Sequence, residues 1–324
     1  ARPSPRLDGM GRIPAHRLRL DCGRHWNHWG MDIRSQHLIH PKPIALLPLK
    51  RARGFLGEPM KNTARKKLPT YRQLLGVANA KTTKGEALGY LTGILYLAPH
   101  KISGRNVCAH ASKGCALGCL YSAGMGAFSN VQAARIQKTR EFHADPKGFV
   151  EMLARNIERL VKRAEKLGLK PCIRLNGTSD LPWENLGGMT GENLMDRFPD
   201  VAMYDYTKNP NRIKPSYTVG LPKNYSLTFS ASESNGKAVE KAIGWGVPVA
   251  MVFSGIPKTA KIPALRWGLR IVDGDKHDLR FLDRGAGIVA LRAKGEAKKD
   301  DTGFVRPFNT RFLSISSPKT PCAI

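Results

Sequence analysis

The sequence lacks any run of about 18 consecutive apolar residues, the shortest stretch that usually crosses a membrane as a helix. It also lacks the apolar segment of a secretory signal near its start, so we expect a soluble, cytoplasmic protein without a membrane partner. Cysteine is scarce, because six in 324 residues cannot build a disulfide scaffold. In a reducing compartment, closely spaced cysteines indicate metal binding or catalysis before they indicate disulfide bonds.

Acidic residues are also few. Asp and Glu number 25 against 53 Lys and Arg, which gives a formal net charge of +28. Such a charge attracts polyanions and favours contact with nucleic acid, phosphorylated ligands or anionic lipid. A solubilising, arginine-rich surface explains the same composition equally well.

Residues 1–59 contain scattered Pro, Arg, His and Trp without helical or strand periodicity. We expect them to be a disordered basic extension, or a non-native sequence read upstream of a gene that begins at Met60. Residues 60–324 are then expected to form a single α/β domain. The basic start of this domain, residues 60–67, could touch nucleic acid.

Strand-like and helical patterns alternate through the rest of the chain. The β-type runs occupy residues 88–97, 172–175, 201–206, 225–229, 247–253 and 287–291. Helices are predicted at residues 129–142, where Ser129 and Gln132 form a capping-box pattern, at residues 146–167, with Asp145 as N-cap, and at residues 234–244. This alternation predicts a mainly parallel sheet, either an open layer or a complete or partial (β/α) barrel, of which we favour the barrel.

Polar side chains follow several of these β-type runs. Because ligands in such folds bind where the strands end, these side chains are expected to contact a substrate or cofactor. They are Asn176, Thr178, Ser179, Asp180, Glu184, Asp205, Tyr206, Lys208, Arg212, Ser230, Ser232 and Glu233. Helix caps and solvated turns are the alternative explanation for them. A weaker set, His277, Asp278, Arg280 and Asp283, also carries acid and base groups.

The cysteine loop, residues 106–126, reads NVCAHASKGCALGCLYSAGMG and places Cys108, Cys115 and Cys119 in a C-x6-C-x3-C arrangement. Its many small residues permit the tight turns that bring several thiolates to one centre. Thiolates suit zinc, copper(I) or an iron–sulfur cluster. Structural zinc usually has four ligands, and His110 is awkwardly placed as the fourth, whereas three cysteines leave one iron of a 4Fe-4S cluster open. Three small buried cysteines without a metal are the plain alternative.

Five motifs between residues 81 and 305 carry a family resemblance: NVCAHASKGCALGCLYSAG, RLNGTSDLPWEN, YDYTKNPNR, YSLTFSASESN and IVDGDKHDLRFLD. They resemble the phage gene product eighty-eight proteins, an uncharacterised family of phages and bacteria. That family is similar to a divergent radical S-adenosylmethionine (SAM) barrel. This resemblance implies that Cys108, Cys115 and Cys119 bind a 4Fe-4S cluster and that SAM binds its open iron. The usual spacing of such enzymes is C-x3-C-x2-C, from which this loop departs.

Two functions follow as hypotheses. The first is an iron–sulfur, radical-SAM-like enzyme with an unknown substrate, in the host cytoplasm if a phage encodes it. The second is a nucleic-acid-binding or processing protein whose thiolates hold a structural zinc and whose basic segments contact phosphates. A phage accessory protein that binds a host partner is a third reading.

Overall fold

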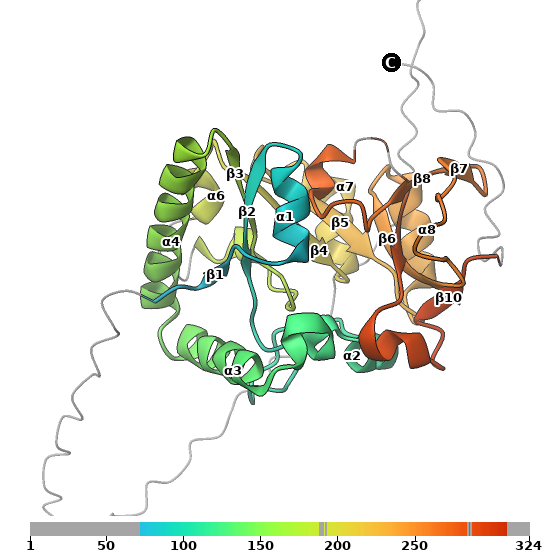
Figure 1. Ribbon diagram of the computed structural model, residues 1–324, viewed down its shortest axis with the longest axis horizontal. Coiled ribbons are helices and arrows are strands. Elements are labelled where there is room, and N and C mark those ends of the chain that lie inside the picture. The colour runs from blue at the N-terminus through green and yellow to red at the C-terminus, as the bar shows by residue number, and fades with distance from the viewer. Residues whose placement is uncertain (1–71, 188–190, 192, 284, 286, 310–324) are drawn as a thin grey trace, which may run out of the picture. The chain divides into compact units, whose positions relative to one another are not determined.

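A ten-stranded and mostly parallel sheet forms the centre of the structure (Figure 1). The computed structural model describes residues 72–187, 191, 193–283, 285 and 287–309. These residues belong to a unit that spans residues 65–324. The extension expected at residues 1–59, with Met60 and the basic segment that follows it, lies outside the described residues.

The strands lie in the order β1-β2-β3-β4-β5-β6-β9-β8-β7, and β10 pairs with β6. Their bounds are β1 Leu75–Gly76, β2 Tyr90–Leu95, β3 Lys170–Arg174, β4 Ala202–Thr207, β5 Tyr225–Ser230, β6 Val249–Ser254, β7 Leu265–Arg266, β8 Leu269–Asp273, β9 Ile288–Arg292 and β10 Val305–Pro307. All neighbouring pairs are parallel except β1 with β2 and β7 with β8, at opposite ends of the path.

The mainly parallel α/β architecture expected from the sequence is therefore confirmed. No pairing among the described strands joins β1 to β7, so the sheet is open and the closed barrel is not formed by this part of the chain. Each of the β-type runs predicted from the sequence is present as a strand, with shifted ends. Strands β1, β7, β8 and β10 were not predicted, because most are too short to show alternation.

Helix α4 (Pro146–Lys166) is the longest helix of the described residues. Asp145 caps it as predicted, since Asp145 Oδ1 accepts a hydrogen bond from Gly148 N at 2.9 Å. Helix α3 (Ser129–Ala144) precedes it, and here the predicted capping box is wrong. Phe128 is the N-cap residue of α3, and Gln132 Nε2 donates to Gly126 O at 3.0 Å, because the turn before the helix presents that carbonyl.

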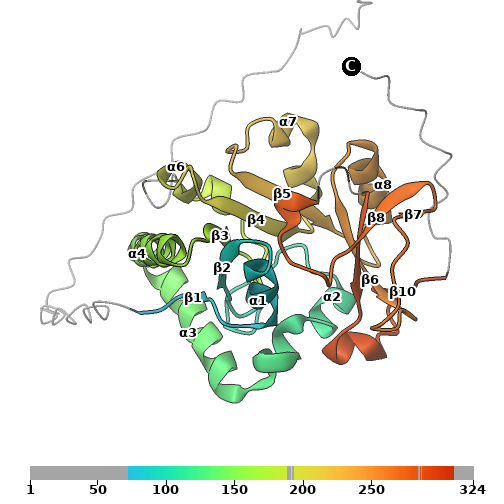
Figure 2. The ribbon, with the colours of Figure 1, turned by 45° about the horizontal axis from the view of Figure 1, so that its top comes forward.

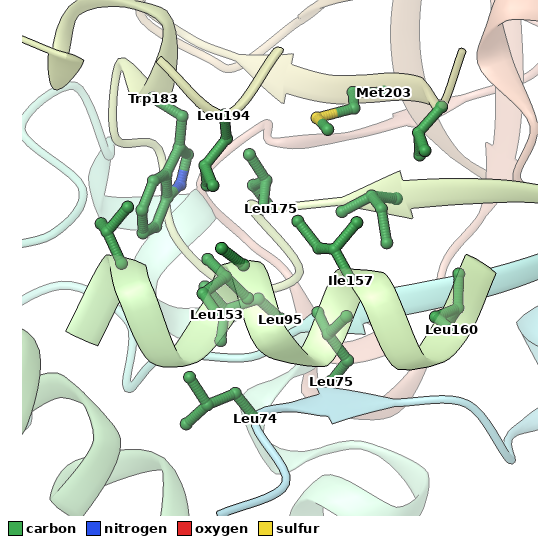
Figure 3. Packing of buried hydrophobic residues seen from close by; sticks show 14 of the residues in the cluster. Leu74, Leu75, Leu95, Leu153, Ile157, Leu160, Leu175, Trp183, Leu194 and Met203 are labelled. Carbon is green, nitrogen blue, oxygen red and sulfur yellow. The ribbon is translucent and has the colours of Figure 1, made fainter. Parts of the chain in front are cut away.

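The inner face of α4 packs against the sheet. Leu153, Ile157 and Leu160 are buried in one cluster with Leu95 of β2 and Leu175 after β3 (Figure 3). Burying a leucine or isoleucine side chain contributes about 1.5–3 kcal/mol, so this face fixes α4 to the strands.

The remaining helices are shorter. They are α1 Ala80–Glu86, α2 Lys113–Leu117, α6 Leu194–Arg197, α7 Pro215–Thr218 and α8 Gly236–Gly244, with the 3-10 turns η1 Leu120–Ser122, η2 Gly124–Ala127, η3 Trp183–Asn185, η4 Pro210–Ile213, η5 Arg280–Leu282 and η6 Gly295–Lys299. Helix α8 begins two residues after the predicted start and ends as predicted. Among the described residues, no helix is long and apolar enough to cross a membrane. Figure 2 shows the strands from β2 to β6 following a curve, with α8 beside β6.

Strand β10 is inserted next to the carboxyl half of β6. Strand β5 pairs with the start of β6, at Val249 and Ala250, whereas β10 pairs with Val252 to Ser254. Strand β9 pairs with β6 along Val249 to Phe253, so β10 occupies the other side of β6, beyond the end of β5. This position brings the segment before β10 to the strand ends, where the cysteine loop also lies.

Candidate functional site

The loops that follow the parallel strands enclose a cavity of about 370 Å³, which we call the strand-end cavity. Parallel strands present their carboxyl ends at one edge of a sheet, and α/β proteins usually bind ligands there. Its polar lining is Cys108, Cys115, Cys119, Arg174, Asn176, Thr178, Ser179, Asp180, Tyr206, Lys208, Ser230, Arg292 and Lys294, among others. All three cysteines of the predicted ligand set therefore face one space.

Five residues that were expected to contact a ligand are not among the described residues lining this cavity: Glu184, Asp205, Arg212, Ser232 and Glu233. Each of them instead makes contacts that hold a neighbouring loop. Ser232, for example, donates its backbone N–H to Asn235 Oδ1 at 2.7 Å, and its carbonyl accepts from Arg306 at 3.0 Å.

Glu233 fixes the start of helix α2 in the cysteine loop. One carboxylate oxygen accepts from Ser112 Oγ at 2.7 Å, and the other accepts from Gly114 N at 2.7 Å. Ser112 is also the N-cap of α2, accepting from Cys115 N at 3.2 Å. A carboxylate near a helix N-terminus is favourable, because it partners amides that have no acceptor within the helix. The loop after β5 thus positions Cys115.

Gly114 leaves no room for a side chain. A Cβ atom there would lie 2.1 Å from Thr302 Oγ1 and 2.5 Å from Phe304 Cβ, both in the segment before β10. The cysteine loop and this segment therefore pack against each other through a glycine.

We expect Gly114→Ala to destabilise the protein by about 1–3 kcal/mol, because the added methyl forces the two segments apart. Urea unfolding would measure the change. Gly236→Ala is the matched control, since a Cβ at Gly236 meets no atom within 4 Å. Equal stability of the two variants would contradict the tight contact at Gly114.

Burial favours the neutral form of the Cys108 and Cys119 thiols, although both residues keep part of their surface exposed. The pKa of Cys108 is raised to about 12, chiefly by burial and to a smaller extent by the neighbouring Cys119, Asp180 and Cys115. Burial likewise raises the pKa of Cys119. The Cys108 thiol lies 3.8 Å from the Thr178 carbonyl oxygen, to which it donates. Thiolates at these positions would need positive charge beside them.

The cysteines share the cavity without converging on a point. Among the described residues, no group of three or more His, Cys, Asp or Glu side chains is placed to hold a metal ion. His110, which the sequence offered as an awkwardly placed fourth ligand, is exposed. It is not among the described residues that line the cavity. Cys172 is buried in β3 beside Thr92, at 3.2 Å between sulfur and hydroxyl, and belongs to the core.

Lys208 supplies one positive charge to the cavity. Its Nζ donates to Ser230 Oγ at 2.8 Å and lies 5.7 Å from the centre of the Phe304 ring. Burial opposes the charged form, but the nearby Cys115 and Asp180 outweigh it and raise the pKa of Lys208 above its ordinary value. The ammonium is therefore charged at neutral pH.

Arg135 of α3 carries another positive charge, close to Cys119, and no feature of the sequence indicated it. Its guanidinium carbon lies 4.7 Å from the centre of the Tyr96 ring and 5.6 Å from that of Tyr121. The residue is 7% exposed, and its buried Nε and Nη1 have no hydrogen-bond partner among the described residues. Burial lowers the pKa of Arg135, and the nearby Tyr96 and Cys119 oppose this. Within the described part of the chain, the two aromatic rings are therefore the main partners of this guanidinium.

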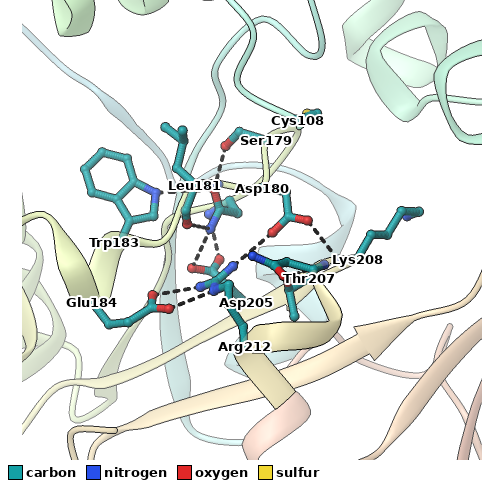
Figure 4. A network of polar contacts seen from close by, with 12 residues as sticks. Cys108, Ser179, Asp180, Leu181, Trp183, Glu184, Asp205, Thr207, Lys208 and Arg212 are labelled. Carbon is teal, nitrogen blue, oxygen red and sulfur yellow. Dashed lines mark hydrogen bonds and ion pairs between the residues drawn. The ribbon is translucent and has the colours of Figure 1, made fainter. Parts of the chain in front are cut away.

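A network of buried polar contacts joins the loops after β3 and β4 (Figure 4). Asp205 accepts from Asn176 N at 2.6 Å, from Asn176 Nδ2 at 3.0 Å and from the Tyr225 hydroxyl at 2.9 Å. Asn176 Oδ1 in turn accepts from Ser179 Oγ at 2.7 Å and from Leu181 N at 2.9 Å. These contacts fix the backbone that lines the cavity at residues 176–180.

Arg212 is the second centre of this network. It binds Glu184 with two bonds of 2.7 Å and Asp180 with one of 2.9 Å, as Figure 4 shows. The other oxygen of Asp180 accepts from Lys208 N at 2.7 Å. A bidentate pair of this kind fixes geometry as well as charge, so Arg212 holds the loop that carries Lys208.

Asp205 should make stability depend on pH. Burial raises the pKa of Asp205 from 3.8 to about 7. A carboxyl whose folded pKa is raised favours the protonated folded state, so its stabilisation is full at low pH and is lost as the pH rises towards 7. Between about pH 5 and pH 7.5, we expect the wild type to lose about 2–3 kcal/mol relative to Asp205→Asn, which does not titrate. Urea unfolding of both proteins at the two pH values would measure this, and a constant difference would contradict it.

Asp278 contacts two residues that line the strand-end cavity, Arg174 and Tyr206, although the sequence around it indicated a functional role only weakly. Its Oδ2 pairs with Arg174 Nη1 at 2.7 Å, and its Oδ1 accepts from the Tyr206 hydroxyl at 3.2 Å. The guanidinium carbon of Arg174 lies 4.4 Å from the centre of the Tyr206 ring. His277 does not act with Asp278, because it faces Asp283 at 3.8 Å. An arginine on a buried strand needs a carboxylate as its partner. Arg174 was therefore the feature of the sequence from which a partner such as Asp278 could have been expected.

These features define an α/β protein with a cysteine-lined cavity at the ends of its parallel strands. Residues 72–307 match the family described as Gene product 88. The chain therefore belongs to this family of phage proteins, as its motifs indicated. No curated protein and no solved structure compared with the chain matches it.

Proposed function

We propose that this protein is an enzyme that binds an iron–sulfur cluster through Cys108, Cys115 and Cys119 and its substrate in the strand-end cavity. The observation that carries the proposal is that three cysteines of one short loop line the same cavity at the carboxyl ends of parallel strands. Cysteines that serve only as small core residues, as Cys172 does, are not expected to line one cavity of ligand size together.

The charges around the thiols support an anionic centre. Lys208 stands beside Cys115, and Arg135 stands beside Cys119. Neither cation forms an ion pair with a carboxylate among the described residues. Three thiolates with a cluster carry net negative charge, and the buried Arg135 beside Cys119 would offset part of it. The sulfur donors also suit iron and exclude hard cations such as Mg²⁺.

A cluster held by three cysteines supplies an iron without a protein ligand, which in a radical-SAM-like enzyme binds SAM. Strands β2 to β6 lie side by side in the same order as in the chain, which is consistent with the partial barrel of such enzymes. Around the cavity, Lys208 would bind an anionic group, and Tyr206 and Arg174 would shape the wall beside it. The network of Asp205 and Arg212 would hold these loops in place.

Anaerobic purification followed by iron, sulfide and zinc analysis tests the proposal. Iron and acid-labile sulfide at about four each per chain, with visible absorbance, are expected for a four-iron cluster. Zinc at about one per chain without visible absorbance would contradict it. Reductive cleavage of SAM by the loaded protein would then separate SAM chemistry from another ligand on the open iron.

A nucleic-acid-processing protein with a structural zinc is the second candidate. The observation that favours it is the exposed side of α4, where basic residues outnumber the acidic Glu158 and Glu165: Arg155, Arg159, Lys162, Arg163 and Lys166. Zinc in the purified protein, together with binding to DNA or RNA that weakens steeply with salt, would support this candidate.

A further inference from the structure

We infer that the strand-end cavity takes a small organic anion: an apolar or aromatic body that carries one carboxylate or phosphate group, bound at Lys208. The inference rests on the proposed function for the use of this cavity as the substrate site. It adds the chemical class of the substrate.

The cations that line the cavity differ in their partners. Arg174 pairs with Asp278 at 2.7 Å, and Arg292 pairs with Asp273 at 2.9 Å. Lys294 pairs with Asp275 at 2.5 Å. Their charge is therefore already offset by carboxylates of the chain.

Lys208 has no such partner among the described residues. Its Nζ contacts a hydroxyl, Ser230 Oγ, and the face of Phe304, and Cys115 lies beside it. Asp180 is close, but its oxygens are occupied by Arg212 and by the backbone amide of Lys208. An ammonium has three donors, and this one has room for an acceptor from a ligand.

The walls around this charge are largely apolar. They include Ile102, Leu120, Val252, Leu291 and Phe304. A cavity of about 370 Å³ is within the range of small-molecule sites, which are apolar with a few polar groups that fix orientation. A single unpaired cation in an apolar space favours a ligand with one anionic end, because a neutral ligand would leave the ammonium desolvated without a partner.

Two fluorescent probes of the same shape test this inference. One is 8-anilinonaphthalene-1-sulfonate, and the other is N-phenyl-1-naphthylamine, which has the same rings without the sulfonate. We expect the purified wild type to bind the sulfonate about tenfold more tightly than the neutral probe, the effect of one charge-assisted hydrogen bond. Lys208→Met should lose this preference and keep its affinity for the neutral probe. Lys294→Met is the matched control, because it removes a lysine from the same cavity, and it should keep the preference.

Equal affinities for the two probes in the wild type, or an undiminished preference in Lys208→Met, would overturn the inference. If Lys208→Met binds neither probe, Lys208→Arg decides: a retained preference for the sulfonate supports the inference, and equal affinities refute it. Iron and sulfide are measured on the same samples. A protein without a cluster that still prefers the sulfonate would refute the proposed function alone, and a protein with a cluster and no preference would refute the inference alone.

Discussion

Cys115→Ala is expected to abolish the binding of iron and sulfide, and Cys108→Ala and Cys119→Ala should each do the same. A cluster with three protein ligands loses its attachment when one thiolate is removed, because Cys108, Cys115 and Cys119 are the only cysteines among the described residues that line the cavity. Iron and sulfide analysis after anaerobic purification, with the visible spectrum, measures the loss.

Cys172→Ala provides the control for these variants. Cys172 is equally a cysteine, but it is buried in β3 and does not line the strand-end cavity. The control should lose some stability and retain the full iron and sulfide content. If Cys172→Ala and Cys115→Ala retain the same amount of iron, the cysteine loop is not the ligand set.

Arg212→Met is expected to destabilise the protein by about 3–5 kcal/mol, the usual cost of leaving a buried ion-pair partner without its counter-charge. The side chains of Arg212 and Glu184 are each 3% exposed, so water cannot replace the lost partner. Asp180 also loses a bond of 2.9 Å, and the loop that carries Lys208 loses its anchor. Urea unfolding measures the stability, and the neutral probe described above measures the integrity of the cavity.

Arg197→Met is the control for the effect of charge. Arg197 bonds Glu151 and Glu158 at the surface, and such exposed pairs contribute about 0.2–1 kcal/mol. A loss below about 1 kcal/mol for Arg212→Met would mean that the network does not hold the loops. The double variant Arg212→Met with Glu184→Leu should recover part of the loss, since it removes the orphaned charge as well.

The sequence predicted the parallel sheet because its strands are buried on both faces. The run that became β6, for example, is apolar over most of its length and is followed by a polar turn, a pattern that agrees with burial on both faces. Helix α4 was predictable because its buried residues recur every three or four positions and because Asp145 and Pro146 mark its start. Strands of two or three residues, such as β1 and β7, are set by their neighbours and have no local signal.

The site was predictable only in outline. That Cys108, Cys115 and Cys119 face a cavity together with Lys208 follows from strand order, which short motifs do not encode. Glu233 was taken for a ligand contact because its position at a strand end resembles one, and its actual partners, Ser112 and Gly114, lie about 120 positions earlier in the chain. Arg135 was missed because an arginine in a helix carries no local sign of being buried.

The contact between Gly114 and the segment before β10 has a consequence for synthesis. The cysteine loop is translated early. Thr302 and Phe304, against which it packs, are among the last of the described residues to be translated. Since domains fold as units once their distant parts are available, the loop cannot take its final form on the ribosome until almost the whole domain has emerged. A cluster would therefore be loaded onto an essentially complete chain, after translation has passed residue 304.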